Sequence, residues 1–368
     1  MKDSPMNRED NPDQLQEKSV IRVMLVDDSL LTLTVLKRGL AGFADIQIVA
    51  TERDARAAFE AIPAVRPDVI CTDLNMPGMD GLAFVKAVMA NYPTPILVIS
   101  VSVFPEDKHN VFSLLKAGAV DVYPKPKGGL SSNNQALFVS LARRIRVIAG
   151  VKVFGRSMIR SYSRQAPLRS GQPDQTPTEL VAIRASTGGP MALYELFSRL
   201  PGQFPVPVVF VQHIAPGFGA GLIRWLDHDM ALSVTVAEDG DQPVPGKIYC
   251  APDNKHLILD RQGRLKVLDT PAVNGHRPSI TLFFESVAEV LGNKAIGVLL
   301  TGMGDDGALG LRAMHDRGAL CFAQDEASSA IYGMPKVAVE IGAVDHQGSP
   351  VEIADALVAR IDQAAETA

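Results

Sequence analysis

Short apolar runs that lack polar alternation set the strongest constraint on the fold of this chain. From residue 21 onward such runs, beginning with IRVMLV, alternate with segments of helical period such as SLLTLTVLKRGL. A strand that is apolar on both faces must be covered on both sides, and a helix between consecutive strands makes those strands parallel. We therefore expect parallel sheets with helices on both faces, which is a doubly wound α/β architecture.

The alternation occurs twice, and polar stretches separate its two occurrences from each other and from the start of the chain. Residues 1–19 are polar and charged, and we interpret them as a disordered arm. Five strand–helix pairs fill residues 20–149, and a Pro-, Ser- and Arg-rich linker covers residues 150–179. A second, larger α/β domain covers residues 180–368, with some antiparallel strands near residues 247–268. Two domains also suit the chain length.

The charge balance and the hydropathy pattern narrow the class of partner. The chain has 36 Lys and Arg against 41 Asp and Glu, a net charge of −5, which does not favour binding to nucleic acid. No apolar run reaches the roughly 18 residues of a membrane span, and the first residues lack the apolar core of an export signal. The three cysteines are far apart, without metal-binding spacing. We expect a cytoplasmic protein without membrane insertion.

Polar residues follow successive strands of the first domain. Asp27 and Asp28 come directly after RVMLV, and Asp73 comes directly after DVICT. The carboxyl ends of parallel strands share one sheet edge, so these acids repel one another unless a cation binds. Mg²⁺ prefers such oxygen ligands, and Ser100 and Lys125 end the next two strands. The set could accept a phosphoryl group on Asp73, with Lys125 neutralising its oxygens and Ser100 hydrogen-bonding to it.

A second interpretation is that Asp28 or Ser29 only caps the helix that follows, and any one acid alone would favour it. The combination of polar residues at successive strand ends favours phosphoryl transfer instead. At this point residues 20–149 resemble a response-regulator receiver domain, through the motifs VDDS, DLNMPGMDG and the Lys-Pro pair.

The resemblance assigns a role to each polar strand end. It implies that Asp73 is the phospho-acceptor and that Ser100 and Lys125 are the switch pair, with Ser102 as a weaker rival of Ser100. The Mg²⁺ ligands that it implies are three carboxylates, those of Asp27, Asp28 and Asp73.

A serine on a strand-to-helix turn is the candidate nucleophile of the second domain. In LVAIRASTGGP a strand ends just before Ser186, and a Gly-Gly turn opens the next helix. Helix N-terminal amides there could stabilise an oxyanion, although Ser186 or Thr187 could equally be the helix cap. His213 ends the next strand, PVVFVQ, and could act as the base toward Ser186. Asp305 and Asp306 follow a third strand, and either could orient the imidazole.

The order Ser, His, Asp and the arginine at position 184 disfavour an ordinary esterase of the α/β-hydrolase type. The segments ASTGGP, QHIAPGF and LTGMGDDGA, between about Leu180 and Val344, resemble the methylesterase domain of the chemotaxis CheB family. The resemblance implies hydrolysis of glutamate methyl esters on chemoreceptors with release of methanol, and related enzymes also deamidate glutamine. It implies three catalytic residues, namely Ser186 as nucleophile, His213 as general base and acid, and Asp306 as orienting carboxylate.

The resemblance also implies partners and a mode of control. The substrate would be methylated cytoplasmic helices of chemoreceptors, and a histidine kinase would be the phosphodonor. The cofactor would be Mg²⁺ in the receiver domain, with none in the catalytic domain. Until it is phosphorylated, the receiver should lie over the Ser186 cleft.

Two alternatives stay open. Arg184 stands where the family usually has glycine, which leaves room for a catalytically weak, receiver-controlled adaptor that binds a receptor or partner. Asp325 also follows a strand and is the second choice for the third triad member. His256 and His276 lie near turns, and we expect His256 to be a packing residue.

Overall fold

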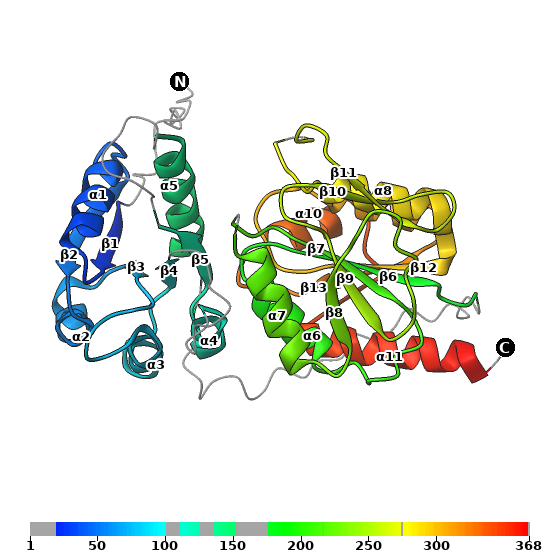
Figure 1. Ribbon diagram of the computed structural model, residues 1–368, viewed down its shortest axis with the longest axis horizontal. Coiled ribbons are helices and arrows are strands. Elements are labelled where there is room, and N and C mark those ends of the chain that lie inside the picture. The colour runs from blue at the N-terminus through cyan, green and yellow to red at the C-terminus, as the bar shows by residue number, and fades with distance from the viewer. Residues whose placement is uncertain are drawn as a thin grey trace, which may run out of the picture.

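Two α/β units follow each other along the chain and lie side by side in the computed structural model (Figure 1). The structure describes residues 20–100, 111–125, 135–151, 153, 176–215, 217–273 and 275–366. The expected arm at residues 1–19 lies outside the described residues, as do Ser102 and most of the linker at residues 150–179.

The first unit is a parallel sheet that, in the described residues, has five strands in the order β2-β1-β3-β4-β5. The strands are β1 (Ile21–Val26), β2 (Ile46–Glu52), β3 (Val69–Thr72), β4 (Ile96–Ser100) and β5 (Asp121–Pro124). The helices are α1 (Leu30–Leu40), α2 (Ala55–Val65), α3 (Gly81–Asn91), α4 (Val111–Ala117) and α5 (Gln135–Ala149). The expected doubly wound sheet is confirmed.

Polar caps start the first three helices of this unit. The side chains of Ser29, Asp54 and Asp80 accept hydrogen bonds from first-turn amides of α1, α2 and α3, which satisfies donors that have no partner within the helix. The capping alternative therefore holds for Ser29. Gly81 opens α3 where a Cβ atom would lie 2.7 Å from the carbonyl oxygen of Asp73, so the Asp-Gly pair brings α3 directly under the Asp73 loop.

The second unit has a larger sheet, whose strands within the described ranges number seven and are all parallel, in the order β14-β13-β12-β6-β7-β9-β8. The strands are β6 (Leu180–Ala185), β7 (Val208–Gln212), β8 (Ser233–Val236), β9 (Lys247–Cys250), β12 (Ala295–Leu299), β13 (Leu320–Gln324) and β14 (His346–Gly348). Antiparallel pairing is confined, among described strands, to the separate hairpin of β10 (His256–Leu259) and β11 (Leu265–Leu268). Of the region expected to be antiparallel, β9 instead joins the parallel sheet.

Helices cover both faces of the larger sheet (Figure 1). They are α6 (Gly189–Phe197), α7 (Gly219–Asp229), α8 (Ile280–Leu291), α9 (Ala308–Asp316), α10 (Met334–Glu340) and α11 (Pro350–Glu366). Strands β6, β7 and β12 are buried along their whole length, as expected for strands covered on both sides. Their carboxyl ends, at Ala185, Gln212 and Leu299, therefore reach one edge of the sheet at its centre. None of the described helices is both long and apolar enough to cross a membrane.

The two units meet along α4 and α5 of the first and along α6 and α7 of the second (Figure 1). Trp225 on α7 is stacked between Phe112 on α4, at 5.2 Å between ring centroids, and Tyr194 on α6, at 4.9 Å. Lys116 lies 4.3 Å from the centroid of the Tyr194 ring and forms an ion pair of 2.5 Å with Asp229. The apolar core thus continues from one unit into the other.

Candidate functional site

The acidic residues of the first unit lie together at the carboxyl edge of its sheet. Asp27 and Asp73 are buried, and Lys125 binds both, with its Nζ atom 2.7 Å from Asp27 Oδ2 and 2.5 Å from Asp73 Oδ2. Burial raises the pKa of Asp73, an effect that Lys125 partly opposes. The pKa of Lys125 is also raised, because its hydrogen bonds to the two carboxylates outweigh burial.

This acidic edge suits a divalent cation. One ligand oxygen from each of Asp27, Asp28 and Asp73 lies within 4.8 Å of the others, and Lys125 offsets only part of their negative charge. Three carboxylates of this spacing match the hard oxygen ligands that Mg²⁺ prefers. Ser100, buried at the end of β4, accepts a hydrogen bond of 2.8 Å from the backbone amide of Lys125 through its carbonyl. The polar residues predicted at the strand ends of the first domain therefore lie at one edge of its sheet.

In the second unit, Ser186 lies on a sharp turn between β6 and α6. Its amide donates to the Thr301 carbonyl at 3.0 Å, which ties the turn to the end of β12. The helix cap is Gly188, with φ of 75° and no side-chain hydrogen bond, so the alternative in which Ser186 or Thr187 caps α6 is wrong. Gly302 lies so close that a Cβ atom there would approach Ser186 Cβ to 2.6 Å.

Gln212 holds the Ser186 turn against the end of β7. Its buried side-chain amide donates to the carbonyl oxygens of Ser186 at 2.8 Å and of His213 at 2.7 Å. Gln212 is absent from the site residues predicted from the sequence. The available signal was a polar amide at the end of the otherwise apolar run VVFVQ, where burial demands hydrogen-bond partners.

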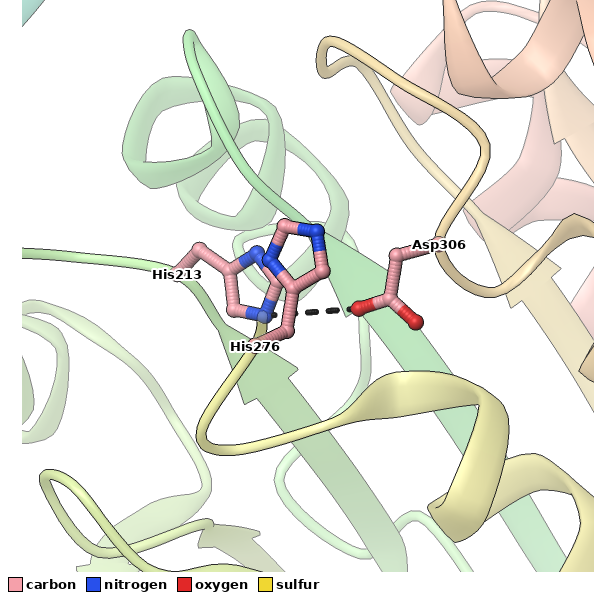
Figure 2. Close-up of side chains that lie close together, drawn as sticks. All are labelled: His213, His276 and Asp306. Carbon is pink, nitrogen blue, oxygen red and sulfur yellow. Dashed lines mark ion pairs between the residues drawn. The ribbon is translucent and has the colours of Figure 1, made fainter. Parts of the chain in front are cut away.

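His213 lies at the same edge, with one ring nitrogen bound by backbone and carboxylate. Its Nε2 atom is 2.8 Å from the Pro278 carbonyl oxygen and 3.5 Å from Asp306 Oδ2 (Figure 2). The ring of His276 is stacked on it, with 4.9 Å between centroids and 6° between planes. In the part of the chain that the structure describes, no hydrogen bond joins the Ser186 hydroxyl to His213. The imidazole is thus held in place by the Pro278 carbonyl, Asp306 and His276.

Asp306 is fixed by the N-terminus of α8. Its carboxylate accepts from the Thr281 hydroxyl at 2.9 Å, from the Thr281 amide at 3.2 Å and from the Ile280 amide at 3.3 Å. A helix N-terminus stabilises such a negative charge. Asp305 is exposed. The Asp325 carboxylate accepts hydrogen bonds from the amide and the hydroxyl of Ser328, three positions along the chain. Of the three carboxylates considered from sequence, Asp306 is the one beside His213.

The electrostatics of this site keep the histidine neutral. Burial and, after it, the nearby Arg184 guanidinium lower the pKa of His213, while Asp306 opposes them. Although burial alone would raise it, the pKa of Asp306 lies below its usual value because Arg184 and His213 stabilise the carboxylate. A neutral imidazole beside an ionised carboxylate is the state that a general base requires.

His213, His276 and Asp306 could in principle hold a metal ion, since their ligand atoms lie within 4.8 Å of one another. The two imidazole planes are nearly parallel and stacked, however, so their in-plane lone pairs do not converge on one point (Figure 2). The arrangement suits proton transfer better than metal binding. His256 lies elsewhere, fully buried between the Pro271 carbonyl and the Ser279 amide, and is a packing residue as expected.

The receiver-like unit contacts the Ser186 turn directly. Arg144 on α5 forms an ion pair of 2.8 Å with the buried Asp121 and donates a hydrogen bond to the hydroxyl of Thr187. Beside this contact, the two units enclose a cavity of about 1100 Å³, lined by Lys116 and Arg146 on one side and by Gly188, Met303 and Tyr332 on the other. The first unit therefore packs against the residue that follows Ser186 in the chain.

Comparisons with known proteins agree with both units. Residues 23–130 match the response regulator receiver domain family, and residues 181–357 match the CheB methylesterase family. The chain is 38% identical over 341 residues to protein-glutamate methylesterase/protein-glutamine glutaminase 4 of Geobacter metallireducens, which covers 92% of this chain and 98% of that protein. It is 41% identical to a protein-glutamate methylesterase/protein-glutamine glutaminase of Sulfurimonas denitrificans, over 88% and 94% of the two chains.

Among solved structures, the Thermotoga maritima CheB methylesterase catalytic domain is 36% identical, with a TM-score of 0.48 over 49% of this chain and 97% of that one. Both curated relatives carry the name of an enzyme, which does not favour the adaptor alternative. The chain belongs to the protein-glutamate methylesterase/protein-glutamine glutaminase family of receiver-domain proteins.

Proposed function

We propose that this protein hydrolyses γ-glutamyl methyl esters on chemoreceptor helices through Ser186, under control of phosphorylation at Asp73. The observation that carries the proposal is the convergence of Ser186, His213 and Asp306 at the carboxyl edge of the larger sheet, with Asp306 held at a helix N-terminus beside the imidazole. The names of the relatives supply the substrate class.

In the first half-reaction, Ser186 Oγ attacks the ester carbonyl carbon and His213 takes the hydroxyl proton. Backbone amides beside Ser186 and in the turn at Met303 hold the negative charge of the tetrahedral oxygen. Asp306 stabilises the imidazolium that forms. When the carbon–oxygen bond breaks, methanol departs with the proton from His213, and a glutamyl ester of Ser186 remains.

In the second half-reaction, His213 removes a proton from water, which attacks the acyl carbon and releases the glutamate carboxylate and the Ser186 hydroxyl. The same residues would deamidate glutamine, with ammonia leaving in place of methanol. The two outcomes differ only in the leaving group, so one site serves both.

The acidic edge of the first unit would receive the phosphoryl group. We propose that an Asp73 oxygen attacks the phosphorus of a phosphohistidine on a kinase, and that the histidine nitrogen leaves. Asp27, Asp28 and Asp73 would hold Mg²⁺, which supplies positive charge to the transferring oxygens when it is bound. Lys125 adds a fixed positive charge, and the Ser100 hydroxyl would hydrogen-bond the new phosphate.

Control of hydrolysis would follow from the contact between the two units. In the structure, Arg144 binds Thr187 next to the nucleophile, and the Phe112–Trp225 stack closes the same interface. We propose that the regulatory domain covers residues 20–149 and the catalytic domain residues 180–368. Phosphorylation of Asp73 would weaken the contact between them. Such control requires that the interface be stronger in the unphosphorylated form. A phosphoryl group that affected the docked and separated states equally would not shift the equilibrium between them.

The partners that we propose are methylated receptor helices, which lie on the cytoplasmic side of the membrane, and a histidine kinase. Exposed Met303 and Leu309, on either side of Asp306, are suited to meet the apolar stripe of a helix. All three cysteines are buried free thiols, which fits a cytoplasmic site of action.

The test is release of methanol from methylated receptor membranes by the intact protein, with and without a small-molecule phosphodonor. Methanol release should rise with the phosphodonor and vanish in Ser186→Ala, because no other hydroxyl of the turn replaces the nucleophile. Ser198→Ala, which removes a serine hydroxyl at the far end of α6, is the matched control and should leave release unchanged. Equal release by wild type and Ser186→Ala would refute the proposed nucleophile.

A further inference from the structure

Arg184 is the largest side chain that is fully buried in the described residues. It is the penultimate residue of β6, two positions before Ser186, and is 0% exposed. Its Nε and Nη1 atoms have no hydrogen-bond partner among the residues that the structure describes. Because a buried guanidinium without a full set of partners is costly, a cation in this place calls for an explanation beyond packing.

The guanidinium is directed at the other two polar groups of the site. Its Nη2 atom lies 3.4 Å from His213 Nδ1 and 3.8 Å from Asp306 Oδ2. Gly307 closes over it, since a Cβ atom there would lie 3.2 Å from Nη1. The arginine therefore lies between the histidine and the start of α9, in contact with both members of the His–Asp pair.

The chemistry of the two side chains determines the tautomer of His213. Arginine only donates hydrogen bonds, so Nδ1 of His213 must present its lone pair to Arg184. The proton must then be on Nε2, which donates to the Pro278 carbonyl at 2.8 Å. The nitrogen that would take the proton from Ser186 is thus the one that faces a fixed positive charge.

We propose that Arg184 is a positioning residue, which donates to the lone pair of His213 Nδ1 and thereby keeps the imidazole neutral and in one tautomer until substrate is bound. The inference rests on the proposed function, because it takes His213 as the base. At 3.4 Å the contact is long enough to be replaced by a donor on the substrate side.

The groups that face His213 from its surroundings are Arg184 on β6, Asp306 after β12 and His276 before α8. Asp305 lies farther out and acts on the arginine. Burial, Arg184 and His276 all lower the pKa of His213, whereas Asp306 and the hydrogen bond to the Pro278 carbonyl raise it. Removal of the guanidinium must therefore raise this pKa. With Arg184 present, the base should stay unprotonated in mildly acidic solution, at the cost of reduced basicity.

The test follows the imidazole itself by NMR, in full-length protein with histidine selectively labelled with ¹³C, with the His213 resonance assigned through His213→Asn. In wild type the resonance should not titrate between pH 8 and about pH 5. In Arg184→Met, which keeps the length of the side chain without its charge, the midpoint should rise by about 1 unit or more. Arg184→Lys should remain close to wild type.

Equal titration of His213 in wild type and Arg184→Met would overturn the inference, as would a wild-type midpoint near pH 6.5, the ordinary value for histidine. If Arg184→Met does not fold, as judged by circular dichroism, Arg184→Gln takes its place, and the wild-type titration remains decisive by itself. The readout needs no turnover, so failure of the proposed hydrolysis would show in the Ser186→Ala assay and not here.

The pH profile of methanol release gives an independent measurement on the same variants. The acid limb of kcat/KM should move to higher pH in Arg184→Met, in step with the NMR midpoint, and should return toward wild type in Arg184→Lys. An arginine that only filled space would lower release at every pH equally and leave the limb in place.

Discussion

Each of the two sheets places a cation at its carboxyl edge, the half-buried Lys125 in one and the buried Arg184 in the other, and the two cations are used in opposite ways. Lys125 is shared by two carboxylates, at 2.7 and 2.5 Å. Arg184 has Asp306 at 3.8 Å and a histidine nitrogen at 3.4 Å, and two of its nitrogens have no hydrogen-bond partner within the described ranges. Accordingly the pKa of Lys125 is raised, whereas burial lowers the pKa of Arg184 to about 9.

The number of acids around each cation, and not its place in the fold, therefore decides how the cation changes the charge of its site. Two carboxylates bind Lys125, and an oxygen of a third, Asp28, lies within 4.8 Å of theirs, so the site remains negative and can attract a further cation. In the described part of the chain, Asp306 is the one buried carboxylate paired with Arg184, and the positive charge of the arginine also acts on His213. One edge is therefore built to collect positive charge, and the other to keep a base neutral.

The largest effect should come from removing the buried carboxylate beside Arg184. Asp306→Asn takes away the counter-charge that lies nearest to the arginine and the imidazolium, and should lower kcat for methanol release by about 10³ to 10⁴-fold. Asp305→Asn, one residue away and exposed, should change it by less than about threefold. If the two variants lose equal activity, the distinction between the adjacent aspartates is wrong.

Removal of the other cation should affect control rather than chemistry. Lys125→Met leaves Asp27 and Asp73 to repel each other and removes the charge that would meet the phosphate, so the phosphodonor should no longer raise methanol release. Lys37→Met, at an exposed position on α1, should respond like wild type. Full activation of Lys125→Met by the phosphodonor would show that Lys125 is not required for control.

A smaller effect is expected on stability at low pH. The pKa of His213 is below its ordinary value of 6.5 in the folded protein, so below pH 6.5 the unfolded chain binds the extra proton. The free energy of unfolding should therefore fall as pH drops below 6.5, until the folded pKa is reached. Urea titrations of His213→Asn should show a weaker decline, and those of the exposed His228→Asn the wild-type decline.

The smallest effect should come from the surface of the domain contact. Lys116→Ala loses the ion pair with Asp229 and the contact with the Tyr194 ring, which should raise methanol release without phosphodonor about two- to fivefold. Arg261→Ala loses an exposed ion pair with Glu289 away from that contact and serves as the control. Unchanged release in Lys116→Ala would show that this pair does not hold the units together.

Much of this architecture could be predicted because the candidate functional residues directly follow apolar strands in the sequence. The apolar runs before Asp27, Asp73, Ser186 and His213 located each residue at a sheet edge, and parallel pairing then brought them together. The choice of Asp306 over Asp305 needed the resemblance, because adjacent residues differ only in which of them faces inward.

Other features depend on packing between distant segments and leave no local signal. The stacking of His276 on His213 joins two loops 63 positions apart, and nothing near His276 in sequence predicts it. Arg144 has the spacing of an ordinary exposed helix residue, and only the docking of α5 shows that it reaches Thr187. The side chain of Arg184 was uncertain for the same reason, since its direction depends on Gly307 and the start of α9.

The contact between Arg144 and Thr187 links the state of the catalytic turn to the state of the receiver. If phosphorylation favours separation of the two units, then anything that occupies the vacated cleft must favour phosphorylation to the same degree, because linkage between two binding events is reciprocal. A methylated receptor would then shift the equilibrium toward the phosphorylated state. The amount of substrate would in this way set the level of the signal that removes it.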